Sequence, residues 1–131
     1  MLSISKRSQY GLYFLIFLAK SKQGKFFSIK KTAKILHLPY RYLSQIAKDL
    51  KDKQILASKE GSGGGYFLTK KPEEISILEI IELLQEPINL IDCEQNICEH
   101  KHNCKMRKIF LSLDNQMQTM LKDIKLTAFY D

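Results

Sequence analysis

The sequence predicts a mostly α-helical fold with one small β-hairpin, in which a winged helix-turn-helix precedes a long C-terminal dimerisation helix. Three observations lead to this prediction. Helical patterns precede a glycine-rich hairpin signal, basic residues crowd into the same half of the chain, and an apolar stripe of helical period ends the sequence. We expect the winged region to span residues 1–71 and the dimerisation region to span 72–131. The 131 residues are about the length of one domain.

Three helices are predicted before the hairpin. Residues 4–21 are apolar nearly all round, which is typical of a helix enclosed by other elements. Ser28 is suited to cap a second helix, and Pro39 is expected in the first turn of the third helix. In the third helix, the spacing i, i+3, i+4, i+7 predicts four inward-facing apolar side chains: Leu43, Ile46, Ala47 and Leu50.

The opposite face of the third predicted helix is polar and suits a DNA major groove. Arg makes a bidentate contact with guanine and Gln with adenine, and Arg41 and Gln45 lie one turn apart on this face, with Ser44 beside them. Lys48 and Lys51 lie further along the helix and suit phosphates. An ordinary solvated helix face has a similar composition, so this pattern alone does not decide between the two interpretations.

A hairpin is predicted from two extended segments, 54–59 and 66–70, joined by five residues of which four are glycine. Neither a phosphate-binding loop motif nor a dinucleotide fingerprint in its proper context is present. Glycines let a backbone approach a phosphate chain closely, and four of them exceed what a turn requires. We therefore interpret the tip as a DNA-contacting wing formed by Ser62, Gly63, Gly64 and Gly65.

The remaining chain contains a fourth helix, an irregular loop and a fifth helix. Ser76 with Glu79 predicts a capping box for the fourth helix, and Pro87 is expected to end it. The loop spans 88–104. The fifth helix, 105–127, carries an apolar stripe that folds back on the chain's own core or pairs with a second copy; a module that reads a palindromic site would use the pairing.

All three cysteines of the chain fall in this loop, at Cys93, Cys98 and Cys104, with His100 and His102 between the last two. An odd number cannot pair entirely into internal disulfides. Thiolates crowded with histidines suit an iron–sulfur cluster or zinc, the latter held for instance by the three cysteines and His100. A third interpretation is that the thiols sense oxidants without a metal.

The charge distribution favours a nucleic-acid partner. Residues 1–71 carry 15 basic and 3 acidic residues, a net charge of +12, whereas residues 72–131 carry 6 and 11, a net charge of −5. No catalytic motif is present, so no enzyme and no catalytic residue is predicted. A small iron–sulfur carrier would leave the basic half unexplained, and ferredoxin-type cysteine spacings are absent.

The sequence predicts a cytoplasmic protein. An apolar run at residues 10–19 follows two basic residues, but it is too short to span a membrane and no cleavage site of a signal peptide follows it. In the cytoplasm the thiols stay reduced and available to a metal. We expect no membrane partner.

Two runs of sequence resemble the signature of the Rrf-two family of bacterial transcriptional regulators, which includes IscR, NsrR, RirA and CymR. They are GSGGGYFL at 61–68 and KPEEISI at 71–77, and the segments 2–12 and 43–56 are also similar. The likeness covers essentially the whole chain. It implies a homodimeric winged helix-turn-helix repressor or activator in which a long C-terminal helix crosses that of the partner.

The resemblance also implies roles for individual residues. Cys93, Cys98 and Cys104 match the ligands of a [2Fe–2S] or [4Fe–4S] cluster. Arg41, Ser44 and Gln45 fall where family members read bases, and residues 62–65 form the wing. Binding to a palindromic operator in double-stranded DNA would then depend on the cluster, which senses redox state, nitric oxide or iron status.

The chain departs from the family pattern in ways that bear on the fourth ligand. Where one subgroup has a histidine after the last cysteine, this sequence has Arg107, and the first helix contains neither a carboxylate nor a histidine. The fourth ligand must come from elsewhere, for example from a small exogenous molecule or from one of four loop residues: His100, His102, Glu94 and Glu99. Glu60 stands before the wing glycines, where a basic residue is expected.

Overall fold

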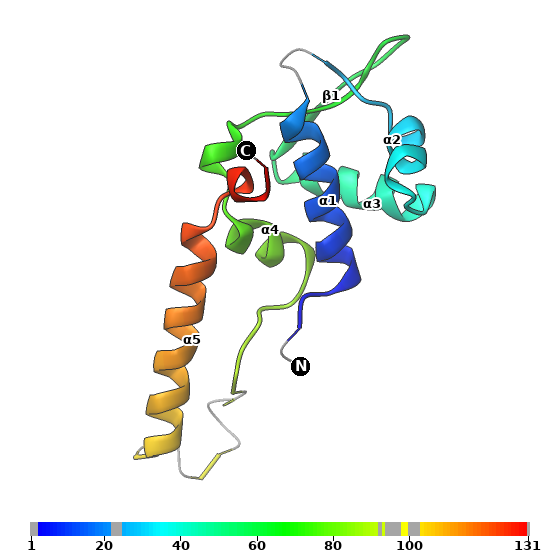
Figure 1. Cartoon of the computed structure of the whole chain (residues 1–131). Helices are drawn as coiled ribbons and strands as arrows, with labels where there is room; N and C mark the ends of the chain where they lie inside the picture. Colours follow the sequence, from blue (N-terminus) through cyan, green and yellow to red (C-terminus); the bar gives the residue numbers. More distant parts are fainter. Residues whose placement is uncertain (1–2, 22–24, 92, 94–97, 100–102, 131) are drawn as a thin grey trace.

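The computed structural model describes residues 3–21, 25–91, 93, 98–99 and 103–130. Its order of helices and hairpin confirms the predicted fold class (Figure 1). The elements are α1 (Lys6–Lys20), α2 (Ile29–Leu36), α3 (Tyr40–Asp52), β1 (Leu56–Lys59), β2 (Gly65–Leu68), the 3-10 turn η1 (Pro72–Glu74), α4 (Ile77–Leu84), α5 (Lys105–Asp123) and the 3-10 turn η2 (Leu126–Phe129).

Helix α1 lies at the centre of the winged region, as its apolar sequence predicts. Ser5 caps it by accepting a hydrogen bond from the backbone N–H of Ser8, and Phe14 and Leu15 are fully buried. The helix contacts α2, α3, α4, β2 and η2. A Cβ at Gly11 would lie 2.3 Å from Leu84 Cδ1, so glycine allows α4 to approach α1 closely.

Helices α2 and α3 form the helix-turn-helix. Ser28 caps α2, as predicted, by accepting a hydrogen bond from Lys31 N. His37 ends it in the left-handed conformation, with φ of 55°. Pro39 is the N-cap residue of α3 and not a residue of its first turn, because its ψ of 126° is extended. The four apolar residues predicted to face inward from α3 are all buried.

The hairpin is shorter than predicted and is joined by a third segment. Strands β1 and β2 pair antiparallel from Leu56 opposite Leu68 to Lys59 opposite Gly65. The predicted first strand began at Gln54, but the φ of Gln54 is 65°, which is not a strand conformation. Phe27 bridges Tyr66, whose backbone N–H donates to the Phe27 carbonyl at 2.9 Å.

The fourth helix begins and ends near the predicted residues, but its capping box is only half formed. Ser76 Oγ accepts a hydrogen bond from Glu79 N at 3.1 Å. The Glu79 carboxylate instead pairs with Lys70 Nζ at 2.9 Å. This ion pair ties α4 to the end of the wing.

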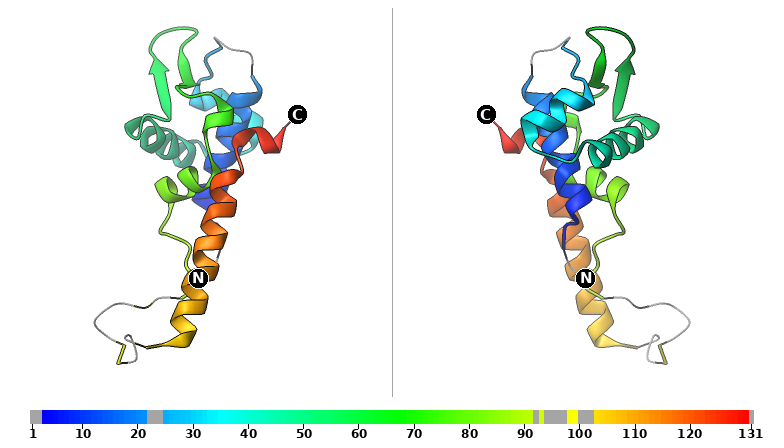
Figure 2. Two further views of the ribbon diagram at one scale, coloured as in Figure 1. Left: turned by 90° about the vertical axis from the view of Figure 1, so that its left-hand side faces the viewer. Right: turned by 90° about the vertical axis from the view of Figure 1, so that its right-hand side faces the viewer.

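The fifth helix ends at Asp123, earlier than the predicted 127. Ile77 N donates to the Ile124 carbonyl, and Leu126 N donates to the Ile75 carbonyl. These bonds draw the chain out of the helix and seat Leu126 fully buried in the core. The chain that follows α5 is therefore fixed to the start of α4 and to the core, while the N-terminal half of α5 projects away from them (Figures 1 and 2).

The projecting helix exposes the predicted apolar stripe. Ile109 and Met120 are 61% and 66% exposed, and Met106 and Leu113 are exposed beside them. The one buried residue of α5 is Asp114. Within the described part of the chain, no helix has the length and apolar character needed to cross a membrane.

Candidate nucleic-acid interface and cysteine loop

Helix α3 presents its polar face beside the wing in a shallow groove of about 300 Å³. Four predicted residues line this groove together: Arg41, Ser44, Gln45 and Lys48. Arg41, Gln45 and Lys48 are exposed and Ser44 is half-buried. Lys51 is also exposed, but it lies outside the groove on the last turn of the helix.

Two tyrosines complete the groove and were missed by sequence reasoning. Tyr40 is the first residue of α3 and is 54% exposed. Tyr66 reaches the groove from β2 and its ring packs edge-on against Phe14 of the core, with 6.4 Å between centroids. The position of Tyr40, four residues before Ser44, was a usable helical signal. No local signal places Tyr66 there, because its position depends on how the hairpin folds back.

The groove carries positive charge from Arg41 and Lys48. Asp49 forms an ion pair with Arg7, which ties α3 to α1. Among the described residues that line the groove, none is acidic. Arg41 and Lys48 therefore face solvent without a carboxylate in the groove, an arrangement that attracts a polyanion.

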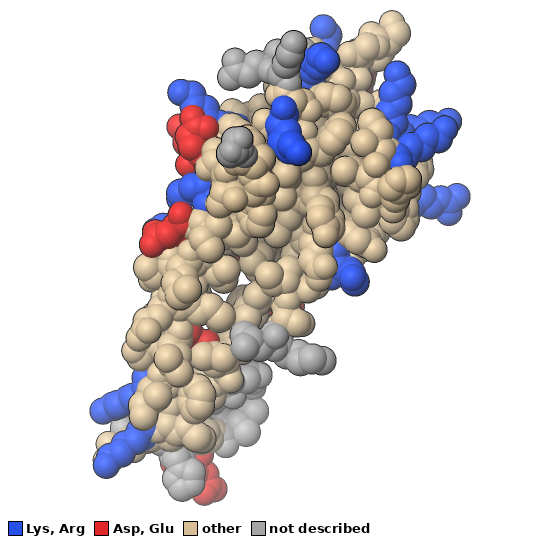
Figure 3. All heavy atoms as spheres, viewed as in Figure 1, with Lys and Arg blue, Asp and Glu red and all other residues tan. Residues whose placement is uncertain are grey.

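Basic side chains continue from this groove onto α2. Lys30, Lys31 and Lys34 are all exposed. In the space-filling view, Lys and Arg gather on the side of the molecule that α2 and α3 form (Figure 3). A basic surface of this kind attracts a polyanion such as a nucleic-acid backbone.

The cysteine loop, residues 88–104, brings its last cysteine to the start of α5. Cys104 is the N-cap residue, and its Sγ accepts a hydrogen bond from the backbone N–H of Arg107 at 3.4 Å. The three cysteines are free thiols and half-buried. Among the described residues, no three His, Cys, Asp or Glu side chains lie close enough together to hold a metal ion. The donor set suits a soft metal centre, but the three thiols are not gathered into one.

Of the four loop residues predicted as possible fourth ligands, the structure describes one. His100, His102 and Glu94 lie outside the described residues, and Glu99 is exposed. The start of the loop is fixed to the middle of α5, since Leu90 N donates to Asp114 Oδ1 at 2.7 Å. Asp114 is only 5% exposed. Both ends of the cysteine segment therefore meet α5.

A family model described as an iron-dependent transcriptional regulator, Rrf2 (the Rrf-two family), matches residues 4–131. The chain belongs to the Rrf2 family. It is 27% identical over 111 residues to the regulator NsrR of Shouchella clausii strain KSM-K16, covering 82% of this chain and 74% of the relative. It is 33% identical over 91 residues to CymR of Bacillus subtilis strain 168, covering 70% and 66%. These relatives are transcriptional regulators and not enzymes, which confirms the prediction that this chain is not an enzyme.

Solved structures of the Rrf2 family confirm the winged helix-turn-helix fold. CymR of B. subtilis, described as a global cysteine regulator, has a TM-score of 0.82 and 28% identity with both chains fully covered. The oxidised form of Staphylococcus aureus CymR has a TM-score of 0.73 and 27% identity, covering 95% of this chain and 92% of that one. T. potens IscR has a TM-score of 0.74 with coverages of 96% and 84%; at 22% identity it shows the fold alone.

Each glycine in the wing of this Rrf2 chain has a conformational reason. Gly61 and Gly63 have φ of 98° and 78°, where side chains are strained. A Cβ on Gly64 would lie 2.1 Å from the Lys59 carbonyl oxygen, and one on Gly65 would lie 2.3 Å from the Phe27 carbonyl carbon. The turn accounts for three of these glycines and the neighbouring segment at Phe27 accounts for the fourth, Gly65, so the backbone explains all four without a phosphate.

The side chains around this wing are also partly committed to internal contacts. Lys59 places Nζ over the Phe26 ring, 5.2 Å from its centroid, and Lys70 is paired with Glu79. Ser62 and Gly63 at the tip are exposed, whereas Gly64 and Gly65 are half-buried. Of the four predicted wing residues, the tip pair is the better placed to meet another molecule.

Proposed function

We propose that this Rrf2 regulator binds a palindromic operator in double-stranded DNA as a homodimer, and that an iron–sulfur cluster on its three cysteines sets the affinity. One observation supports DNA binding above the others. Arg41, Ser44, Gln45 and Lys48 share one solvent-facing groove that no described acidic residue lines, inside a wider basic surface.

The groove residues divide into base readers and phosphate contacts. We assign Arg41 to a guanine, Gln45 to an adenine and Ser44 to an adjacent base edge, as their hydrogen-bonding groups require. Tyr40 stands beside them and suits a phosphate or a thymine methyl group. Lys48, Lys51 and the lysines of α2 suit phosphates on both sides. The wing, residues 62–65, follows the backbone nearby, with the exposed tip in closest reach.

A matched pair of variants tests this division. Gln45→Ala removes a base contact and should cost about 1–3 kcal/mol on a selected operator but little on random DNA. Lys51→Ala removes a phosphate contact and should weaken binding to both DNAs alike, lowering the slope of log affinity against log salt by about 0.9. Fluorescence anisotropy across a salt series measures both. Equal losses for Gln45→Ala on operator and random DNA would contradict base reading.

The homodimer is proposed from α5. Its exposed stripe of Met106, Ile109, Leu113 and Met120 is the kind of contiguous apolar patch that marks a protein–protein interface. Pairing two copies through this stripe buries it and sets the two recognition helices at a fixed separation. A palindromic operator requires such a pair, with half-sites about one turn of DNA or a multiple of it apart.

The cluster is proposed from the donor set and from the position of the loop. Cys93, Cys98 and Cys104 would hold it, with His100 or His102 as the candidate fourth ligand, and the family description as iron-dependent supports this choice. When bound, the cluster supplies sensitivity to oxygen, nitric oxide or iron shortage. Cys104 caps α5 and Leu90 is bonded to Asp114, so a change in the loop is transmitted to the dimerisation helix and to the spacing of the recognition helices.

Metal analysis of anaerobically purified protein tests the cluster. Wild type should show a visible absorbance band with iron and sulfide, and Cys98→Ala should lose the stable cluster. A full cluster in Cys98→Ala would refute the ligand assignment. Zinc without sulfide would identify the zinc alternative, and no metal at all would leave the thiols as direct oxidant sensors. The proposed cluster and DNA target both place the protein in the cytoplasm, where thiols stay reduced.

A further inference from the structure

A hollow between α2 and the start of α3, the α2 hollow, adjoins the recognition groove. Its volume is about 390 Å³, and five described residues line it: Lys30, Ala33, Lys34, Leu38 and Tyr40. Of the residues that the structure describes, Tyr40 alone lines both the α2 hollow and the recognition groove. The two therefore meet at the side chain of this residue.

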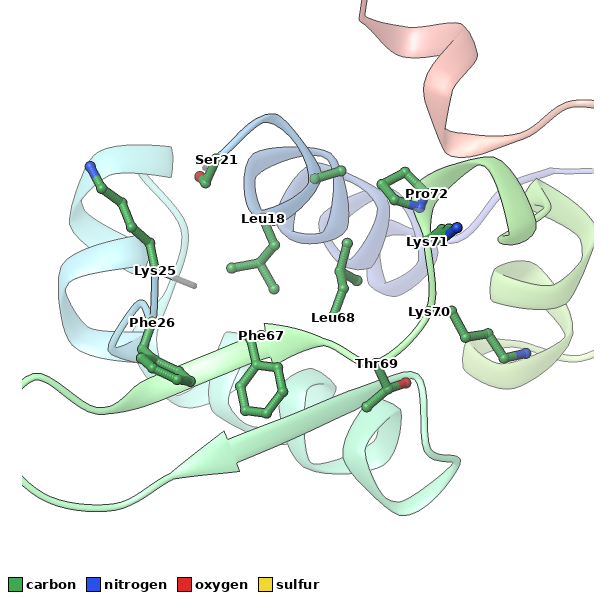
Figure 4. A pocket seen from close by; sticks show the side chains of 11 residues that line it. Leu18, Ser21, Lys25, Phe26, Phe67, Leu68, Thr69, Lys70, Lys71 and Pro72 are labelled. Atoms are coloured by element: carbon green, nitrogen blue, oxygen red, sulfur yellow. The ribbon is translucent and has the colours of Figure 1, made fainter. Parts of the chain in front are cut away.

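Two lysines of the α2 hollow lie one helical turn apart on the same face of α2. Lys30 and Lys34 are both exposed, and within the described part of the chain neither forms an ion pair. No described residue of the lining is acidic. The cavity beside β2 offers no such pair, because Lys25 and Lys71 lie at opposite ends of its lining (Figure 4). The α2 hollow is therefore the better site for the closely spaced charges of a phosphate backbone.

The remaining lining of the α2 hollow suits a nucleotide more than a free anion. Ala33 is buried and Leu38 is half-buried, so the hollow has an apolar floor. Leu38 N donates to the Ala33 carbonyl at 2.9 Å, which holds the turn before α3 against α2 and fixes this floor. A bare anion would leave the floor in contact with water, whereas the sugar of a nucleotide would cover it.

Tyr40 is placed to contact a base and the backbone together. It is the first residue of α3, directly after the extended Pro39, and it is 54% exposed. In helix-turn-helix proteins, the N-terminal residues of the recognition helix contact base edges. An aromatic ring makes apolar contact with the methyl group of thymine. The tyrosine hydroxyl, at the far end of the ring, can donate a hydrogen bond to a phosphate.

We propose that Tyr40 is a specificity-determining residue, which selects thymine beside the bases that Arg41 and Gln45 read. Its ring contacts the thymine methyl group, and its hydroxyl donates to the stretch of backbone that Lys30 and Lys34 hold in the α2 hollow. This inference deepens the proposed operator binding and rests on it. Because one side chain makes both contacts, the preference for thymine is linked to the hold of α2 on the backbone.

Replacement of single thymines tests the ring contact. A duplex that the wild-type chain enriches from a random pool is made with deoxyuridine at each thymine in turn, which removes only the methyl group. At one position in each half-site, the affinity of wild type should fall about fourfold, the effect of one buried methyl group. Tyr40→Phe keeps the ring and should show the same fall, whereas Tyr40→Ala should bind the two duplexes equally.

Neutral methylphosphonates in place of single phosphates test the α2 hollow. One methylphosphonate next to the selected thymine should weaken binding by wild type at least about tenfold, as expected for charge-assisted hydrogen bonds. The double variant Lys30→Ala with Lys34→Ala should lose much less, because it has no charge there to lose. Lys31→Ala is the matched control. Lys31 is exposed on the same helix but outside the described lining, so this variant should keep the wild-type sensitivity.

Three results would overturn the inference. They are an operator in which no thymine is sensitive to deoxyuridine, a sensitivity that Tyr40→Ala shares with wild type, and a methylphosphonate effect that persists in the double lysine variant. Each of these leaves the proposed function standing, since the chain has still selected and bound an operator. If the pool yields no enriched sequence, the proposed function is refuted and the role of Tyr40 falls with it.

Discussion

At the scale of single residues, two wing glycines differ in what a methyl group would meet. A Cβ on Gly61 has open space around it, so alanine there bears only the cost of a φ of 98°. A Cβ on Gly65 meets the Phe27 backbone at 2.3 Å in addition to a φ of 150°. That contact cannot relax without parting Phe27 from Tyr66, because both clashing atoms belong to the backbone.

Alanine at these two positions should therefore have unequal effects on stability. We expect Gly61→Ala to lower the free energy of unfolding by about 1 kcal/mol and Gly65→Ala by about 3 kcal/mol, through strain together with overpacking. Urea denaturation at one protein concentration measures both. Equal losses would show that the third segment of the hairpin is not held against β2 as described.

At the scale of elements, the Asp114 carboxylate is the described hydrogen-bond link between the cysteine loop and the middle of α5. Asp114→Ala removes the acceptor of Leu90 N, and Asp114→Asn keeps an oxygen there. We expect the alanine variant to lose about tenfold of the hydrogen-exchange protection of the Leu90 amide, equivalent to about 1.4 kcal/mol, and the asparagine variant to lose less. Unchanged protection in Asp114→Ala would mean that the loop start is fixed by other contacts.

Short-range chemistry explains which elements the sequence could predict. The caps at Ser28 and Ser76 and the buried face of α3 depend on neighbours within one or two turns, and all are confirmed. Hydrogen bonds between segments far apart in the sequence could not be predicted. The end of α5 at Asp123 follows from the bond between Ile124 and Ile77, whose sequence separation no helical periodicity encodes.

The candidate site shows the same division. Arg41 and Gln45 were found because both lie on one helix and period alone places them together. Tyr66 was missed, since its place in the groove arises only where the hairpin meets α3 in space. The wing glycines were also found from the sequence, but the reason given was a close approach to phosphate. The structure explains them instead by their backbone angles.

At the scale of the whole molecule, the two regions differ in charge as well as in architecture. The winged region carries a net charge of +12, and the region with the loop and α5 carries −5. A duplex attracted to the first is repelled by the second, which favours an approach along the side formed by α2 and α3 (Figure 3). In the proposed complex, the start of α5 then lies away from the DNA (Figure 1).

The last prediction concerns the exposed apolar stripe of α5. Ile109 is 61% exposed in one chain, so Ile109→Glu should leave the folded monomer intact. In the proposed dimer the glutamate would be buried against a second stripe without a partner charge, at a cost of about 2–4 kcal/mol. Sedimentation equilibrium should show at least about a 30-fold rise in the dimer dissociation constant. Affinity for the full operator should fall far more than affinity for one half-site.

Asn115→Glu, at an exposed polar position on the side of α5 away from the stripe, is the matched control and should remain dimeric. A wild type that sediments as a monomer, or an Ile109→Glu variant that dimerises as tightly as Asn115→Glu, would contradict pairing through this helix.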